Sequence, residues 1–161
     1  MNTLIVTVGL PRSGKSTWAR EVTKQIHSPI VNPDAVRMAI TGQRFVKHAE
    51  PLVWTIVQCM VRALFQAGHN SVILDATNTT KARRKFWLDE CRNGFYGDDA
   101  KVSFIVFDTP VDVCKQRAIH GGMKDLLPII DSMNEGFESL DPVTEPNRDV
   151  HDVLAGILGL L

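Results

Sequence analysis

The sequence predicts an α/β fold, in which a mostly parallel β-sheet is covered by helices. Short apolar runs rich in Val, Ile and Leu alternate along the chain with longer stretches of helical character. The runs are apolar throughout, as expected for strands of a parallel sheet, which are buried on both faces. Strands that alternate with helices are joined by right-handed crossovers, and these place helices on both sides of the sheet.

Length and composition indicate a single domain over residues 1–161. A chain of 161 residues with 44% hydrophobic and 22% charged residues is ordinary for a globular protein, which excludes disordered, collagen-like and disulfide-scaffold classes. Three cysteines, Cys59, Cys91 and Cys114, are too widely spaced for a metal or redox motif, so we expect buried thiols in a reducing compartment, the cytoplasm. No run approaches the ~20 apolar residues of a membrane span.

Acidic and basic residues balance over the whole chain but not along it. There are 18 of each, which argues against a protein that holds nucleic acid by bulk charge alone. Residues 1–92 carry 13 basic and 6 acidic side chains, whereas residues 93–161 carry 5 and 12. The first part of the chain is therefore the better candidate for contact with an anionic ligand.

The first half of the chain contains clear signals for the ends of its elements. Gly9 ends the first apolar run, Gly68 predicts the end of a long apolar helix, and Asn32 with Pro33 predicts a helix start, as N-cap and first helical residue. The expected elements are strands at 1–8, 28–31 and 71–74 and helices at 15–26, from 33 onward, at 51–67 and at 79–92.

The second half continues the alternation. Thr109 and Pro110 predict another helix start, again as N-cap and first residue, and Gly121 with Gly122 interrupts the helical pattern. The expected elements are a strand at 101–107, helices at 110–120 and 126–140, a small helical lid at 117–126, a loop at 142–146, and an apolar tail at 147–161 that docks as a helix or edge element.

A phosphate-binding motif follows the first strand. Residues 9–16, GLPRSGKS, match G-x-x-x-x-G-K-[ST] at every required position, between a predicted strand and a predicted helix. The glycines allow backbone N–H groups to surround a phosphate, and the N-terminus of the helix adds partial positive charge. The lysine of this motif reaches the β- and γ-phosphates, and its serine hydroxyl binds Mg²⁺. We therefore expect ATP and Mg²⁺ as cofactors, with nucleotide contacts from Gly9, Arg12, Ser13, Gly14, Lys15, Ser16 and Thr17.

The motif narrows the predicted fold to the three-layer sandwich of a P-loop NTPase. The base-reading motif N-K-x-D of GTPases does not occur in the sequence, and the chain is short for an ATPase motor. A small phosphotransferase remains, and its acceptor must lie opposite the γ-phosphate.

Polar residues follow the next two predicted strands, where ligands of an open parallel sheet gather. Asp34 could accept the proton of an acceptor hydroxyl, and Arg37, one helical turn later, could hold a phosphate; a dipole-stabilising aspartate and a solvated arginine explain this pair equally well. Asp75 follows its strand as a Walker B aspartate does and is expected to bind Mg²⁺, or else it caps the strand. Thr77 and Asn78 line the acceptor pocket or cap the next helix.

The densest basic run lies on a predicted helix, at residues 81–85 (KARRK). A run of this kind is more often a solvated face than a binding site. The alternative is contact with the backbone of a polynucleotide, with Arg84 as a substrate-binding residue. Three tryptophans at helical positions are predicted as core residues: Trp18, Trp54 and Trp87.

Arg117 stands where the lid is expected to begin. Lids of nucleotide kinases close over the phosphates and bring in an arginine that neutralises charge in the transition state. Arg117 is therefore a candidate for catalysis beside Lys15 and for contact with ATP. A simple helix-ending turn explains the following glycines nearly as well.

Four ordered motifs resemble the P-loop polynucleotide kinase family, in particular the kinase domain of the bacteriophage polynucleotide kinase–phosphatases. The likeness covers about residues 1–140. Its motifs are the P-loop continued through residues 17–21 (TWARE), Asn32-x-Asp34-x-x-Arg37, Asp75-x-Thr77-Asn78 with Arg83-Arg84, and Phe107-Asp108-x-Pro110 leading to Arg117.

The resemblance implies transfer of the γ-phosphate of ATP to a polynucleotide hydroxyl, in that family the 5′-OH end. It implies that Asp34 is the general base and that Arg37 binds a phosphate of the acceptor. It also implies that Lys15 and Arg117 stabilise the transferring phosphoryl group and that Ser16 holds Mg²⁺.

The sequence departs from the family's pattern on the acceptor side and in the lid. Pro33 and Ala35 flank Asp34 where the family has a basic and an acidic residue, and Gly121, beside His120, replaces a second basic residue of the lid. The acceptor therefore stays open between a hydroxyl of DNA or RNA, a hydroxymethylated base in DNA, and a small molecule such as a nucleoside, sugar or antibiotic. A nucleotide-gated binding module is the alternative that is not an enzyme.

Overall fold

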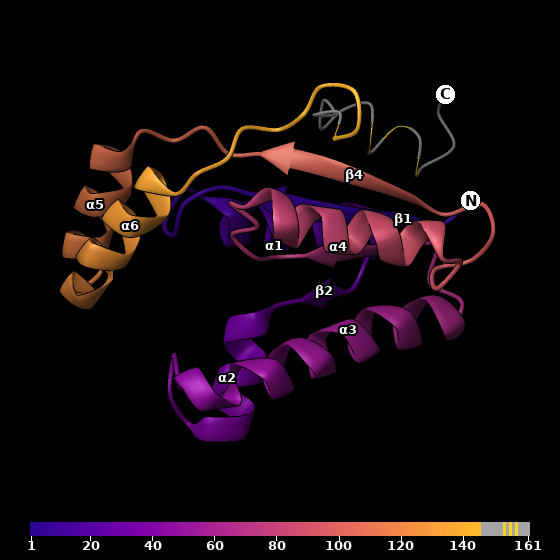
Figure 1. Ribbon diagram of the computed structural model, residues 1–161, viewed down its shortest axis with the longest axis horizontal. Helices are drawn as coiled ribbons and strands as arrows, with labels where there is room; N and C mark the ends of the chain where they lie inside the picture. Colours follow the sequence, from indigo (N-terminus) through magenta and orange to yellow (C-terminus); the bar gives the residue numbers. More distant parts are fainter. Residues whose placement is uncertain (146–152, 154, 156, 158–161) are drawn as a thin grey trace.

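Four strands form one parallel sheet in the computed structural model of the protein, which describes residues 1–145, 153, 155 and 157. Their order across the sheet is β2-β3-β1-β4, so the first strand is central (Figure 1). Because all four run in the same direction, their carboxyl ends meet at one edge. The strands are β1 (Thr3–Val8), β2 (Ile30–Val31), β3 (Ser71–Leu74) and β4 (Lys101–Val106).

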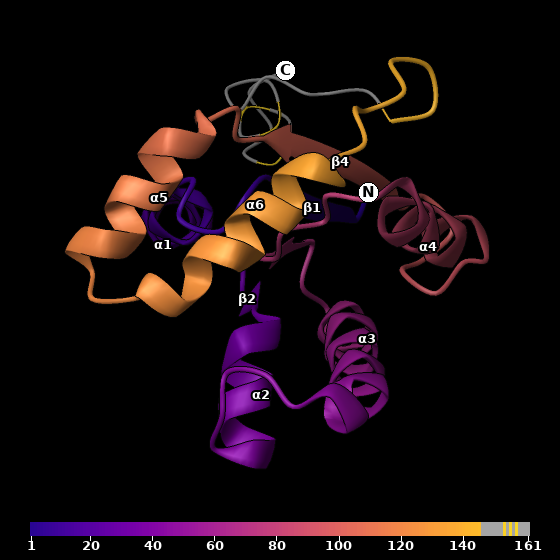
Figure 2. The ribbon, with the colours of Figure 1, turned by 60° about the vertical axis from the view of Figure 1, so that its left-hand side comes forward.

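Helices cover both faces of this sheet, which confirms the predicted α/β fold class (Figures 1 and 2). The helices of the fold are α1 (Lys15–Ile26), α2 (Pro33–Thr41), α3 (Glu50–Gln66), α4 (Lys81–Arg92), α5 (Val111–His120) and α6 (Leu127–Glu135), with 3₁₀ turns η1 (Lys47–Ala49) and η2 (Lys124–Leu126), and α5 and α6 lie beyond the carboxyl ends of the strands (Figure 1). Among the described residues, no helix is both long enough and apolar enough to cross a membrane.

Alternate residues of β1 belong to two different cores. Leu4 packs in a cluster with Val57 of α3 and Trp87 of α4, whereas Ile5 packs in a second cluster with Val22 of α1. Successive side chains of a strand point to opposite faces of the sheet, so a strand covered on both faces must be apolar throughout. This explains the uninterrupted apolar run with which the chain begins.

Two helix ends follow the signals in the sequence. Asn32 caps α2, because its side-chain oxygen accepts a hydrogen bond from the Ala35 N–H at 2.9 Å, and Pro33 is the first helical residue. After α3, Gly68 adopts the left-handed conformation, φ 93°, that glycine reaches without a clash at Cβ.

Other boundaries differ from the predictions. The strand expected at 28–31 is limited to Ile30–Val31, since Pro29 has no N–H to donate to the sheet. The helix expected from residue 79 begins at Lys81, after Thr80 as N-cap. The helix expected at 126–140 begins at Leu127, after the 3₁₀ turn η2, and ends at Glu135, ahead of Gly136.

The N-cap predicted at Thr109 is also wrong. Pro110 occupies the N-cap position and α5 begins at Val111. The Thr109 hydroxyl instead donates to the Ser13 carbonyl at 2.8 Å, so this residue connects the end of β4 to the phosphate-binding loop.

The expectations for the cysteines and for the tail are met only in part. Cys114 is buried and Cys91 is half-buried, but Cys59 is exposed on α3, which contradicts the prediction of three buried thiols. Within the predicted apolar tail, Val153 is buried and packs in the cluster that contains Ile5. The rest of the prediction for 147–161, apart from residues 155 and 157, lies outside the described residues.

Candidate active site

The phosphate-binding loop connects β1 to α1 at the carboxyl edge of the sheet. A Cβ at Gly9 would lie 2.9 Å from the Phe107 carbonyl oxygen, so only glycine fits where the loop leaves the strand. Gly14 is the N-cap of α1 and has φ 107°, a value that side chains rarely allow. The loop thus turns tightly into a helix N-terminus, where free N–H groups and the helix dipole favour an anion.

Lys15 is buried inside this loop. Its ammonium donates to the Leu10 carbonyl and, at 3.1 Å, to Ser13 Oγ. Burial lowers the pKa of Lys15 from 10.5 to about 8, against a raising effect of Asp75, Cys114 and Asp34. Burial of the charged ammonium costs free energy of solvation. A bound anion would offset this cost, because an opposite charge nearby favours the charged form.

Arg117 at the end of α5 contacts the phosphate-binding loop at Arg12. It donates from Nη1 to the Arg12 carbonyl at 3.1 Å, and Arg12 donates from Nη2 to the Arg117 carbonyl at 3.2 Å. Arg12 has φ 66°. A Cβ at Gly121 would lie 3.0 Å from Arg12 Nη2, so the glycine at this position keeps room for the arginine.

Asp75 lies at the end of β3 and is nearly buried. The Asn32 amide donates to its Oδ2 at 2.9 Å, so the end of β2 orients this carboxylate. Thr77, two residues further on, is half-buried, and its carbonyl accepts a hydrogen bond from the Gly9 N–H at 2.9 Å. The segment after β3 therefore runs beside the phosphate-binding loop.

Asp34 and Arg37 form an ion pair on the first turns of α2. Arg37 donates from Nη1 to Asp34 Oδ1 at 2.6 Å, and the Asp34 side chain is 78% exposed. Arg37 also binds Glu50 of α3 through two parallel hydrogen bonds, of 2.7 and 2.8 Å. These bonds raise the pKa of Arg37 and lower that of Glu50. Glu50 thus fixes an arginine that in turn holds an exposed carboxylate.

Trp54 and Arg83 extend this cluster of side chains onto α3 and α4. The Trp54 indole donates to Glu50 at 3.2 Å, and the Arg83 guanidinium carbon lies 3.7 Å from the centre of the indole ring. Burial lowers the pKa of Arg83. Trp87 is fully buried in the core, as predicted. Trp18 and Trp54 are half-buried and pack against the core clusters, and Trp54 also stacks with the Arg83 guanidinium.

The side chains of the basic run at 81–85 lie in different environments. Arg83 stacks on Trp54, Lys85 pairs with Asp89 on the surface, and Arg84 is fully buried. Arg84 forms an ion pair with Glu145, at 2.9 Å between Nε and Oε1. This burial contradicts the expectation that Arg84 contacts the substrate. The periodicity of the helix contained a signal for it, since Arg84 shares a face with Trp87 three residues later.

Asn78 is also part of the interior. Its amide nitrogen donates to the Thr7 carbonyl at 2.9 Å, and its oxygen accepts from the Trp87 indole at 3.3 Å. Only 2% of Asn78 is exposed, which contradicts the prediction that its side chain lines the acceptor pocket. It does not cap α4 either, because that N-cap is Thr80.

A pocket of about 430 Å³ adjoins the phosphate-binding loop on the side away from Asp34. Its walls come from the loop, the end of β4, the start of α5 and the segment after α6. No local signal in the sequence indicates this pocket, because residues 106–111 and 134–140, which form two of its sides, are separated by more than twenty residues. It is lined by Leu10, Val106, Phe107, Asp108, Thr109, Pro110, Val111, Asn134, Phe137, Ser139 and Leu140.

An exposed ion pair connects the loop after α2 to the 3₁₀ turn η2. Arg44, in the loop after α2, lies 3.0 Å from Asp125 of η2, and both side chains are more than half exposed.

In the described part of the chain, no group of three or more His, Cys, Asp or Glu side chains is arranged to hold a metal ion.

Comparisons with known proteins show a family and a shared fold. A protein-family model described as an AAA domain matches residues 4–120. A chain of the Pnkp1/Rnl/Hen1 complex is similar at 31% sequence identity and a TM-score of 0.62, over 72% of this chain. The present chain spans 38% of the length of that one.

Two other solved structures share the fold at low sequence identity. One is a Chloroflexus aurantiacus j-10-fl protein assigned as a kinase, with 14% identity, a TM-score of 0.71, and coverage of 99% of this chain and 98% of its own. The other is Chaetomium thermophilum Kti12 in complex with ADP-AlF3, with 17% identity, a TM-score of 0.64, and coverage of 97% of each chain. The shared fold is that of P-loop kinases.

Proposed function

Because this chain belongs to the AAA domain family and has the fold of P-loop kinases, we propose that it transfers the γ-phosphate of ATP to a polynucleotide hydroxyl, most simply the 5′-OH end. The observation that carries the proposal is the exposed Asp34 carboxylate, which is held on the acceptor side of the phosphate-binding loop by Arg37, an arginine that Glu50 fixes in turn. The resemblance to a chain of the Pnkp1/Rnl/Hen1 complex supports it.

ATP binds with its phosphates on the loop and its nucleoside in the adjoining pocket. Backbone N–H groups of residues 9–17 surround the phosphates, and Lys15 turns from the Leu10 carbonyl to the β- and γ-phosphates. Leu10 belongs to both the loop and the pocket, and Thr109 of the pocket is bonded to Ser13 of the loop. A volume of about 430 Å³ is within the range of small-ligand sites.

Mg²⁺ fits the oxygen groups at the ends of β1 and β3. This ion needs only one or two protein oxygens, with phosphate oxygens and water completing its octahedron. The Ser16 hydroxyl and the Asp75 carboxylate would hold it, and Asn32 already orients that carboxylate. The ion neutralises charge on the phosphates during transfer.

Asp34 acts as the general base. It takes the proton of the acceptor hydroxyl while that oxygen forms a bond to the γ-phosphorus and the bond to the β–γ bridging oxygen breaks, which releases ADP. Arg37 binds a phosphate of the acceptor, and Thr77 lies along the same edge. Lys15 and Arg117 stabilise the phosphoryl group in transit, and residues 117–126 form the lid.

The test is incubation with γ-labelled ATP and Mg²⁺ against three acceptor classes: 5′-OH oligonucleotides of DNA and RNA, DNA with hydroxymethylated bases, and a panel of nucleosides, sugars and aminoglycosides. We expect label on the 5′-OH oligonucleotides, and a rate of labelling lower by a factor on the order of 10²–10⁴ with the Asp34→Asn variant. Label on hydroxymethylated DNA only, or on a small alcohol only, would replace the polynucleotide end by that acceptor. Binding of ATP with no transfer to any acceptor would contradict the proposal of an enzyme.

A further inference from the structure

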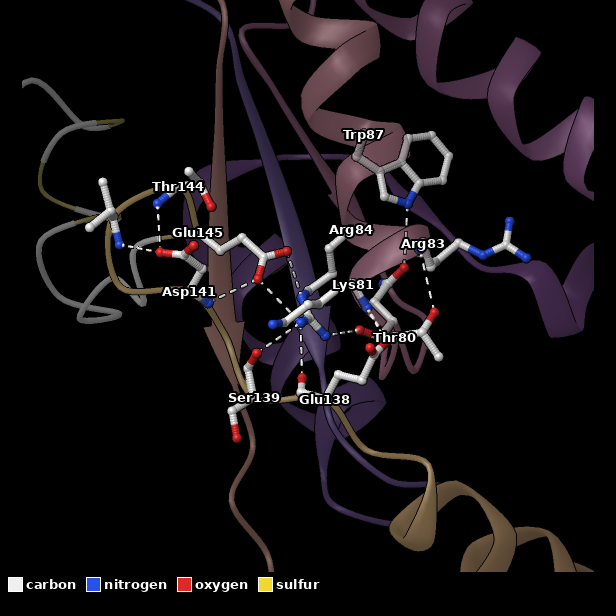
Figure 3. A network of polar contacts seen from close by, with 12 residues as sticks. Thr80, Lys81, Arg83, Arg84, Trp87, Glu138, Ser139, Asp141, Thr144 and Glu145 are labelled. Carbon is white, nitrogen blue, oxygen red and sulfur yellow. Dashed lines mark hydrogen bonds and ion pairs between the residues drawn. The ribbon is translucent and has the colours of Figure 1, made fainter.

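The guanidinium of Arg84 joins elements that are far apart in the sequence. It binds both carboxylate oxygens of Glu145, at 2.9 and 3.2 Å, and donates to the carbonyls of Glu138 and Ser139, at 2.9 and 3.2 Å (Figure 3). A fourth partner is the Asn78 carbonyl, at 3.1 Å. Arg84 has no exposed surface and Glu145 has 4%.

These bonds hold the segment after α6 against the N-terminus of α4. Glu138 strengthens the attachment, because its Oε2 accepts from the Lys81 N–H at 2.7 Å (Figure 3). Its own N–H donates to the Thr79 carbonyl at 3.0 Å. Glu145 Oε2 also accepts from the Asp141 N–H at 3.0 Å. The turn from Asp141 to Glu145 is thereby folded onto the same arginine.

The other side of this segment forms a wall of the pocket beside the phosphate-binding loop. Ser139, whose carbonyl Arg84 holds, and Leu140 both line that pocket. Through Asn78, the same arginine is linked to Thr7, two residues before Gly9. The buried Arg84 side chain therefore fixes the distance between the pocket wall and the start of the phosphate-binding loop.

From this arrangement we infer that Arg84 and Glu145 are positioning residues that set the shape of the nucleoside pocket. The inference rests on the proposed function, which places the nucleoside of ATP there. A planar guanidinium with five N–H donors can bind a carboxylate and three carbonyls at once, which an ammonium cannot do. A buried ion pair usually adds little to stability over an apolar pair of similar size, so stability alone does not account for it.

The consequence is a selective effect on the nucleoside part of the ligand. Loss of the Arg84 bonds frees Ser139 and Leu140, which contact the nucleoside, but leaves the P-loop, which contacts the phosphates. Affinity for ATP should therefore fall, while affinity for inorganic tripolyphosphate should not. At metal sites, loss of a group that orients a ligand costs about 10–100-fold in affinity, and we expect a change at the lower end of that range here.

The experiment compares the Kd values of Mg²⁺-ATP and Mg²⁺-tripolyphosphate by calorimetry. Either single apolar substitution would leave a buried charge unpaired and can prevent folding, so the main variant is the double substitution Arg84→Met with Glu145→Leu. We expect its Kd for ATP to rise about tenfold, with the Kd for tripolyphosphate within about twofold of wild type. Arg84→Lys, which keeps the charge but not the bridging geometry, should raise the Kd for ATP by a smaller factor.

A matched control is available between α3 and α4. Arg62 of α3 and Glu90 of α4 form a second, largely buried two-bond pair, both bonds 2.8 Å long, and neither residue lines the pocket. Arg62→Met with Glu90→Leu should leave both Kd values unchanged. Equal Kd changes for both ligands in the Arg84 variant, or no change in a folded protein, would overturn the inference. A wild type that binds ATP no more tightly than tripolyphosphate would instead refute the placement of the nucleoside.

Discussion

The ATP side and the acceptor side of the site are built in different ways. On the ATP side, all the groups expected to bind phosphate except Arg117 belong to one short stretch, residues 9–17, and most of them are backbone N–H groups at a helix N-terminus. On the acceptor side, Asp34, Arg37, Glu50, Trp54 and Arg83 come from three helices and interact only through their side chains. The first arrangement is set by the local chain path, and the second depends on each ion pair.

The variant Asp34→Asn should have the largest effect, because it removes the proposed general base and leaves the ATP side intact. We expect the rate of transfer to fall by a factor on the order of 10²–10⁴. The dissociation constant of ATP should not change. Single-turnover transfer and equilibrium nucleotide binding measure the two quantities.

Glu21→Gln is a matched control for Asp34→Asn. Glu21 is an exposed carboxylate that pairs with Lys24 on α1, as Asp34 pairs with Arg37 on α2. Its substitution should leave the rate unaltered. A transfer rate of Asp34→Asn within threefold of wild type would exclude Asp34 as the base and return it to the simpler role of a helix-capping charge.

Lys15→Met tests the ATP side. Transfer should fall by a factor on the order of 10²–10³, since a preorganised cation at the transferring group is lost, and ATP affinity should fall with it. The free protein should nevertheless become more stable, because the variant no longer buries an ammonium whose pKa is lowered to about 8. Denaturant unfolding of the ligand-free proteins at pH 7 measures this gain, and a loss of stability would show that Lys15 is held favourably without a ligand.

The difference between the two sides also determined what could be predicted from the sequence. The loop and the caps at Asn32 and Gly68 were predictable because their signals lie within a few residues of the structure they form. Glu50 was not, because its partner Arg37 is 13 residues away on another helix. The Arg84–Glu145 pair spans 61 residues, and no periodicity within one element connects such positions.

Glu50→Gln should have a smaller effect, confined to the acceptor side. Loss of the charged two-bond contact frees Arg37 to leave the position in which it faces Asp34. We expect the KM for the acceptor to rise about 10–100-fold, with the KM for ATP within about twofold of wild type. An equal rise in both KM values would mean that the two sides are not independent.

The pH dependence of ATP binding tests the ATP side separately from the acceptor side. The pKa of Lys15 is about 8 in the free protein, and a bound triphosphate favours the charged form and raises it. Binding should therefore take up a proton between about pH 8 and 10, and affinity should fall by up to tenfold per pH unit in that range. Calorimetry in two buffers with different ionisation enthalpies measures the uptake, and it should be missing in Lys15→Arg, whose side chain stays charged.

The stability of the ligand-free protein should change with pH in the opposite direction to its affinity for ATP. The unfolded chain holds the Lys15 proton up to its ordinary pKa of 10.5, but the folded chain releases it from about pH 8. Between these values the unfolded state binds more protons, so the stability of the ligand-free protein rises with pH in that window. The stability difference between wild type and Lys15→Met should accordingly be largest below pH 8 and narrow toward pH 10. A constant difference would contradict the burial of a charged Lys15.

Asp125→Asn should have the smallest effect, although Asp125 and Arg44 connect the two sides directly. Both side chains are more than half exposed, and solvent screens such a pair to less than about 1 kcal/mol. We expect the midpoint of unfolding and both KM values to stay close to those of wild type at 150 mM salt. The two sides would then communicate only through the sheet that carries them. A change in the KM for the acceptor larger than threefold, abolished in 1 M salt, would instead show that this contact controls access between the lid and α2.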